Sequence, residues 1–238
     1  ITMLFLFLSN ICIENLELFI LCLNNLTDES LPDIIHYFCA ISIPNFFEFF
    51  DLDEIIPEIE SSLDLPVFIK TLLELNSNYP TNQISVSIKS IFQYFVIILE
   101  PVSIEVVQGL FSIYYQFTND ENENKNKICS SINKLSSMMK EKERSLEFYS
   151  ISIEMNIRLL TEVDTSNYYD LLNILNNLIT DSINGINQEE LISLNDLFYQ
   201  IPEFLFELIE ESLDFPIFLI ISEIVKILSI YSTNSSSS

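Results

Sequence analysis

Apolar residues recur at intervals of three and four along most of this chain, and this spacing restricts the fold more than any other feature of the sequence. Residues 53–63 show the pattern clearly, because four apolar side chains share one helical face while the glutamates between them point largely elsewhere. A many-stranded protein would need period-two alternation and glycine-containing turns, yet glycine occurs only at Gly109 and Gly185. The spacing therefore predicts an all-α protein.

The periodic segments divide the chain into about a dozen predicted helices, most of them separated by two to five residues. Their ranges are 4–23, 31–42, 53–63, 65–77, 82–99, 101–117, 127–139, 143–163, 167–182, 188–200, 202–213 and 215–231. Helices of ordinary length joined in series by short loops predict antiparallel pairs stacked as an α-α superhelix, or solenoid. A closed globular bundle is the alternative.

We expect residues 1–231 to form a single solenoid segment. The chain begins with Ile1 rather than Met, and the apolar pattern starts almost at once, so we expect a fragment of a longer protein. The polar run TNDENENKNK predicts an acidic surface loop at 118–127. Low complexity predicts a disordered tail at 232–238.

One decapeptide occurs twice, as IESSLDLPVF from Ile59 and as IEESLDFPIF from Ile209, 150 positions later. In each copy a helical pattern leads into the motif, an aspartate precedes a new helix as an N-cap, and proline occupies an early helical position where its missing N–H costs nothing. The motif therefore predicts the turn of a helical hairpin. Its structural turn residues are Asp64, Pro66, Asp214 and Pro216.

This arrangement resembles a HEAT repeat, in which a first helix with an early proline is followed by a turn carrying aspartate and by a second helix. Pro57 and Asp64 in one copy, and Pro202 and Asp214 in the other, look like those positions. The Val-Arg signature that follows the turn in that family is missing here. The resemblance implies a superhelix of divergent HEAT-like antiparallel helix pairs.

A second resemblance covers roughly residues 120–225, where the acidic loop, the next helix pair, YYDLLNILNNLIT and IPEFLFELIEESLDF follow one another. These segments look like the C-terminal half of importin-β superfamily receptors, nearest to the importin-seven and CAS-exportin branch. The next helix of that branch usually carries a tryptophan, whereas Leu191 falls near that position here. The matching positions are occupied by Tyr168, Tyr169, Asp170, Leu172, Leu175, Ile179 and Thr180.

The resemblance implies a non-enzymatic nuclear transport receptor of the cytoplasm and nucleus, which binds protein cargo, the Ran GTPase and the Phe-Gly repeats of the nuclear pore. A HEAT-like or armadillo-like scaffold outside transport, such as a coat, adaptor or phosphatase scaffold, is the alternative. The candidate partner-binding residues are Asp120, Glu121, Glu123, Tyr168, Tyr169 and Asp170.

Ten Lys and Arg against 35 Asp and Glu give a net charge of −25, which repels nucleic acid and anionic membrane surfaces and favours basic protein partners. The alternative is that the charge only solvates the surface. The apolar segment at residues 1–23 is interrupted by Asn10, Glu14, Asn15 and Glu17, so it predicts a buried amphipathic helix and no membrane insertion.

Residues that carry chemistry do not form a recognisable motif. The single histidine, His36, lies at helical spacing from Asp33 and Cys39, but without further ligands it favours a structural role. The four cysteines have no paired spacing and predict reduced core residues. We expect no catalytic residue, cofactor or metal, and the alternative from the enzyme class is an all-helical hydrolase or lyase that uses carboxylates.

Overall fold

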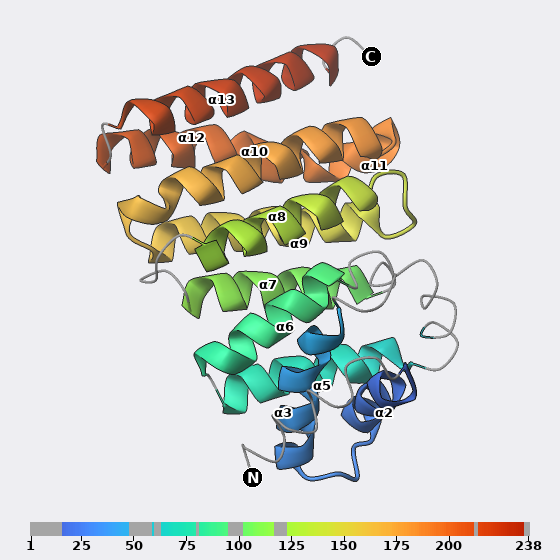
Figure 1. The fold of residues 1–238 in the computed structure, drawn as a ribbon. Helices are drawn as coiled ribbons and strands as arrows, with labels where there is room; N and C mark the ends of the chain where they lie inside the picture. Colours follow the sequence, from blue (N-terminus) through green and yellow to red (C-terminus); the bar gives the residue numbers. More distant parts are fainter. Residues whose placement is uncertain are drawn as a thin grey trace. The chain divides into compact units, whose positions relative to one another are not determined.

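The computed structural model describes residues 16–47, 59, 63–79, 81–94, 102–116, 123–211 and 214–235 (Figure 1). Every element within these ranges is helical, and they contain no strand. The all-α prediction is therefore confirmed. The chain divides into two compact units, residues 1–109 and 110–238, and each is described by itself.

The first unit packs its helices around aromatic and aliphatic side chains. Its elements are α2 (Leu16–Thr27), α3 (Asp33–Ser42), the 3-10 turn η1 (Ile43–Phe46), α5 (Leu65–Asn78), α6 (Asn82–Tyr94) and the first half of α7 (Ser103–Gln116). Helix α2 packs against α3 and α5, and α3 also contacts α5 and α6. Fully buried core residues include Phe19, Leu26, Phe68, Leu72, Ile88 and Phe92.

The second unit is organised around α10, which packs against α8, α9 and α13. After the second half of α7, its elements are α8 (Glu123–Met138), α9 (Ser145–Glu162), η3 (Thr165–Asn167), α10 (Tyr168–Gly185), α11 (Gln188–Leu191), η4 (Ile192–Leu194), α12 (Asn195–Glu211) and α13 (Phe215–Ser235). Helix α12 packs against α13. Within this unit the helices lie in stacked layers, with α13 beside α10 and α12 (Figure 1).

In both units the repeated decapeptide leads into a helix and includes its first residues. Asp64 caps α5, since its Oδ1 accepts a hydrogen bond from the Val67 N–H at 3.3 Å, and Pro66 is the second residue of that helix. Asp214 lies directly before α13, where its carbonyl accepts from the Phe218 N–H at 3.0 Å. The helix predicted at 53–63 lies almost entirely outside the described residues.

The acidic loop ends earlier than predicted, because α8 begins at Glu123 and residues 123–127 are helical. Lys125 explains the difference: it is only 5% exposed and lies three positions before the fully buried Ile128. Its aliphatic stem extends the buried stripe of α8, and its Nζ donates to Asn167 Oδ1 at 3.0 Å. The remaining loop residues, 118–122, lie outside the described residues.

Pro202 does not lie near a helix start, as the sequence suggested, but inside the continuous helix α12. The proline removes one backbone hydrogen bond. Burial outweighs this loss, because α12 buries a stripe at Phe198, Ile201, Leu205 and Leu208 on both sides of the proline. The helix predicted at 188–200 is instead α11, η4 and the start of α12.

The predicted tail at 232–238 is also partly wrong, since α13 continues to Ser235. Tyr231 anchors this end of the helix. Its ring packs edge-to-face on Phe198 with centroids 5.4 Å apart, and its hydroxyl donates to Asn195 Oδ1 at 2.7 Å. Residues 236–238 lie outside the described ranges.

Candidate functional site

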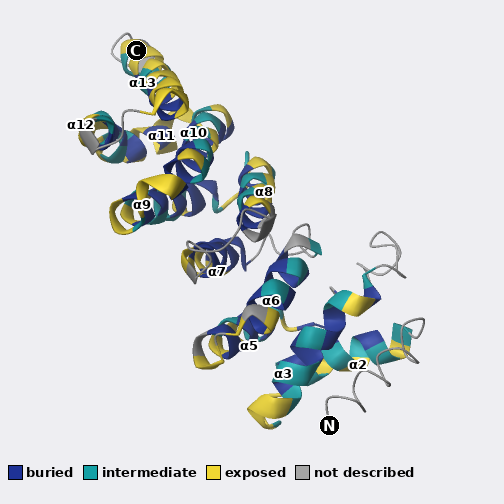
Figure 2. Cartoon of the chain, turned by 60° about the vertical axis from the view of Figure 1, so that its left-hand side comes forward, coloured by how far each residue is buried: buried dark blue, intermediate teal, exposed yellow. Residues whose placement is uncertain are grey.

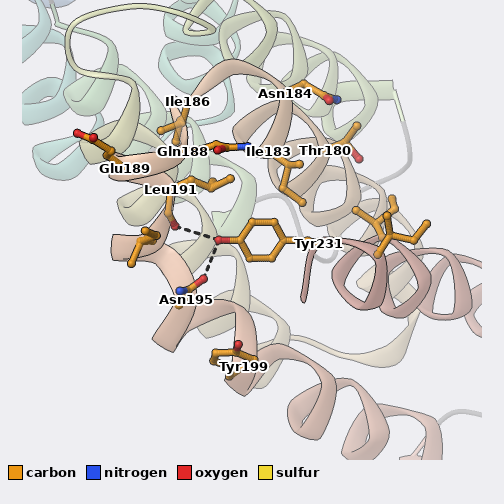
Figure 3. A pocket seen from close by; sticks show the side chains of 13 residues that line it. Thr180, Ile183, Asn184, Ile186, Gln188, Glu189, Leu191, Asn195, Tyr199 and Tyr231 are labelled. Atoms are coloured by element: carbon orange, nitrogen blue, oxygen red, sulfur yellow. Dashed lines mark hydrogen bonds between the residues drawn. The ribbon is translucent and has the colours of Figure 1, made fainter. Parts of the chain in front are cut away.

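A pocket of about 690 Å³ opens in the second unit, between the end of α10, the α11–η4 segment, the start of α12 and the end of α13 (Figure 3). The Tyr231 ring reaches across it, and the hydroxyl that donates to Asn195 also lies 3.5 Å from the Leu191 carbonyl (Figure 3). Burial, followed by the electrostatic effect of Tyr199, raises the pKa of Tyr231.

Among the described residues that line this pocket, no set of groups is suited to acid–base or nucleophilic chemistry. Glu189 is its single carboxylate, and Figure 3 shows that side chain pointing away from the Tyr231 hydroxyl. The other lining side chains are amides, hydroxyls and apolar groups. Such a lining suits a ligand held by apolar contact and a few amide hydrogen bonds.

A second hollow, of about 470 Å³, lies between α9 and α12. Its apolar side chains are the half-buried Ile157, Leu197 and Phe204. Three exposed carboxylates, those of Glu154, Glu203 and Glu207, line it as well. We call this feature the α9–α12 groove.

The helical repeat explains how the groove is built. Leu197, Phe204 and Glu207 follow one another along α12 at intervals close to whole turns, so they share the face turned toward α9. The cation at the groove is Arg158, whose Nε donates to Glu162 Oε1 at 2.9 Å. The groove therefore presents apolar surface beside an excess of negative charge.

Helix α13 carries a third feature, an apolar face open to solvent near its start. Phe215 is 69% exposed, and Phe218 and Leu219 are each about half exposed. Figure 2 shows many exposed residues along this helix. Phe68, which holds the same place as Phe218 in the first decapeptide copy, is fully buried. Exposed apolar surface of this kind marks sites of association.

By length and composition alone, the segment Phe215–Thr233 of α13 also meets the requirements of a membrane span, and 28% of it is buried within the protein. The same segment contains the charged residues Glu223 and Lys226. It also packs against α10 and α12, which is how a helix of a folded helical layer behaves.

The structure separates the residues that the sequence marked as partner-binding. Asp120 and Glu121 lie outside the described residues, and Glu123 is the first residue of α8. Tyr168 is only 4% exposed and belongs to the core, whereas its neighbour Tyr169 is about half exposed. Successive residues of a helix point about 100° apart, so an aromatic pair cannot present both rings on one face.

Asp170 faces inward, toward α8. Burial raises the pKa of its carboxyl above the ordinary value, and the positive charge of Lys125 offsets only part of this rise. The same surroundings raise the pKa of Cys129 to about 12, through burial first and then the charge of Asp170. A thiol with this pKa stays protonated and is a poor nucleophile, so Lys125, Cys129 and Asp170 form a structural cluster.

Other candidate groups from the sequence are also placed. His36 is largely buried, and its Nε2 lies 3.1 Å from the Asp28 carbonyl, which gives the ring a structural partner. Within the described ranges, no three His, Cys, Asp or Glu side chains are grouped as metal ligands.

Sequence reasoning missed the α9–α12 groove. The spacing of Leu197, Phe204 and Glu207 indicated that apolar and acidic residues share one face of this segment. The neighbouring helix supplies the other wall, and a sequence does not state which helices are neighbours.

No protein-family model matches the chain, and no curated protein or solved structure matches it significantly.

Proposed function

We propose that this chain is a non-enzymatic helical-repeat protein that binds other proteins, and that the α9–α12 groove receives a basic peptide segment with an apolar anchor. The observation that carries the proposal is the groove itself, where Ile157, Leu197 and Phe204 lie beside three carboxylates. An apolar side chain of the peptide fills the hollow, and flanking Lys or Arg side chains meet Glu154, Glu203 and Glu207. Charge complementarity of this kind speeds association and selects the partner.

The stacked layers of the second unit support a solenoid in this proposal. In a solenoid each helix pair contacts only its neighbours, so small packing changes accumulate and let the surface adapt to different partners. The HEAT-like pairing suggested by the repeated decapeptide is part of the proposal. No reacting group is needed for this function.

Peptide binding tests the groove. A fluorescein-labelled peptide with one Phe or Leu between Lys and Arg residues is titrated with the protein, and fluorescence anisotropy gives the dissociation constant. The first variant is Glu203→Lys with Glu207→Lys. Exposed charge pairs contribute roughly 0.2–1 kcal/mol each, so reversing two charges is expected to weaken binding by about tenfold.

The matched control carries the same charge change outside the groove, at the exposed residues Glu105→Lys and Glu143→Lys. It should retain most of the affinity at physiological salt, where screening limits long-range effects. A peptide with Phe replaced by Ser should also bind weakly. Equal losses in both double variants, or binding by none of a panel of such peptides, would overturn the proposal.

The more specific form of the proposal is an importin-β-type nuclear transport receptor that moves between cytoplasm and nucleus. The resemblance of residues 120–225 supports it, together with the strongly acidic composition, which suits basic cargo and disfavours direct nucleic-acid contact. In this form the partners are cargo, the Ran GTPase and Phe-Gly repeats of the nuclear pore.

A capture experiment separates this form from a scaffold outside transport. The immobilised protein is incubated with Ran loaded with GTP or with GDP, and with a Phe-Gly repeat peptide and its Ser-Gly counterpart. A transport receptor retains Ran·GTP in preference to Ran·GDP and binds the Phe-Gly peptide. Binding of basic peptides without either of these preferences favours the scaffold, for example a coat, adaptor or phosphatase-scaffold component.

A further inference from the structure

Two thiols meet inside the first unit, on neighbouring helices. Cys22 lies on α2 and Cys39 on α3, which pack against each other. The Cys22 side chain hydrogen-bonds to Cys39, and the Nδ2 of Asn25, one turn after Cys22, donates to Cys39 Sγ at 3.9 Å. Neither cysteine is part of a disulfide; Cys22 is half-buried and Cys39 is buried. Sequence reasoning missed this pair, because the two residues have no motif spacing.

We propose that Cys22 and Cys39 are a site of oxidative modification, at which hydrogen peroxide closes an intramolecular disulfide that joins α2 to α3. This inference does not rest on the proposed binding function, because it concerns different residues and a covalent reaction.

The reaction has two balanced steps. The Cys22 sulfur, the more exposed of the two, attacks one peroxide oxygen as its thiolate; the O–O bond breaks, a sulfenic acid forms, and hydroxide leaves as water after taking up the thiol proton. The Cys39 thiolate then attacks that sulfur; the S–S bond forms, the S–O bond breaks, and hydroxide leaves with the second proton as water. Two thiols and one peroxide give one disulfide and two waters.

The surroundings of Cys39 favour the second step. In the reduced pair, the hydrogen bonds from Cys22 and Asn25 lower the pKa of Cys39, against the opposing effect of burial; once Cys22 is a sulfenic acid, the hydrogen bond from Asn25 remains to stabilise the Cys39 thiolate. Cys129 provides a contrast within the same chain. Burial raises its pKa to about 12, which keeps its sulfur protonated and slow to react.

The experiment uses the full chain with Cys12→Ser, because Cys12 lies outside the described residues and would add a thiol of undefined surroundings. The native protein is treated with hydrogen peroxide, and the remaining thiols are counted with Ellman's reagent after unfolding. Two of the three remaining thiols should disappear and return after dithiothreitol. The product should be monomeric and two hydrogen atoms lighter.

Mapping requires a suitable protease, since the sequence contains no Lys or Arg before Lys70 and trypsin leaves both cysteines in one peptide. Asp-N protease cleaves at Asp28 and Asp33, between the two cysteines, so a disulfide holds two separate peptides together until it is reduced.

Adding Cys22→Ser or Cys39→Ser should abolish the linked peptides, while the matched control Cys129→Ser should retain them. Far-UV circular dichroism checks that each variant is folded. If a variant does not fold, the peptide map of the Cys12→Ser protein alone still shows whether Cys22 and Cys39 are linked. The proposal is overturned if Cys22 and Cys39 remain titratable, if the link involves Cys129, or if it joins two chains.

Discussion

The carboxylate of Asp181 connects α10 to α8 inside the second unit. Removing this carboxylate tests how much its contacts stabilise the packing of α10 against α8. Its Oδ2 accepts hydrogen bonds from Ser136 Oγ at 2.8 Å and from Ser137 Oγ at 3.4 Å. Its Oδ1 lies 2.6 Å from Lys140 Nζ. The Asp181 side chain is only 11% exposed, whereas that of Lys140 is 38% exposed.

The cost of Asp181→Ala follows from these contacts. A hydrogen bond to a charged group contributes roughly 1.5–3 kcal/mol, and a buried hydroxyl left without a partner costs about 1–3 kcal/mol. Ser136 is fully buried and would lose its acceptor. Lys140 contributes less, because its amine is partly exposed and regains water. The effects overlap, so we expect the free energy of unfolding to fall by about 3 kcal/mol.

The measurement is urea unfolding followed by circular dichroism at 222 nm, with hydrogen exchange locating the loss in α8 and α10. Glu162→Ala is the matched control, since it removes a carboxylate from an exposed ion pair with Arg158. Exposed pairs of this kind contribute less than about 1 kcal/mol. A loss below about 1 kcal/mol for Asp181→Ala, or one equal to the control, would refute the reasoning.

Gly185→Ala should destabilise the fold by about 1–3 kcal/mol, because its new methyl would lie 2.9 Å from the backbone Cα of Lys140. Gly109→Ala should cost less, because its methyl would meet only side chains. The urea midpoints of the two variants compare these costs. Burial raises the pKa of Cys129 from 9.0 to about 12, so the folded state keeps a proton that the unfolded chain loses, and stability falls as pH rises through that window. Full titration of Cys129 would lower the free energy of unfolding by about 4 kcal/mol, and Cys129→Ala should remove this loss. The urea midpoint of the variant should therefore depend less steeply on pH, and an unchanged slope would count against the burial of Cys129. Asp64→Ala should cost about 1 kcal/mol through loss of the α5 cap, and Asp64→Asn should restore most of it in thermal unfolding.

The start of α5 illustrates what could be predicted from the sequence and why. Asp64 and Pro66 act on backbone groups within one helical turn, so their roles do not depend on the rest of the molecule. The helix predicted at 65–77 is observed at Leu65–Asn78 for the same reason. Pro202 is the opposite case: its local preference signalled a helix start, but the burial of Phe198 and Leu205 on either side keeps α12 continuous.

The candidate site was less predictable than the fold. Tyr168 and Asp170 were chosen from a resemblance, yet the fold turns Tyr168 into the core and Asp170 toward Lys125. The α9–α12 groove and the Cys22–Cys39 pair each bring together side chains from different helices. No local pattern encodes such a pairing.

By itself, the sequence determined that this protein is helical, where most helices lie, and how the two decapeptide copies lead into α5 and α13, because helix periodicity and capping act over a few residues. Only the tertiary structure decided that Phe68 is fully buried and Phe218 half exposed, although both occupy the same position of one repeated motif. The physical reason is that burial depends on which neighbouring helices cover a face, and this is set by packing across the whole unit.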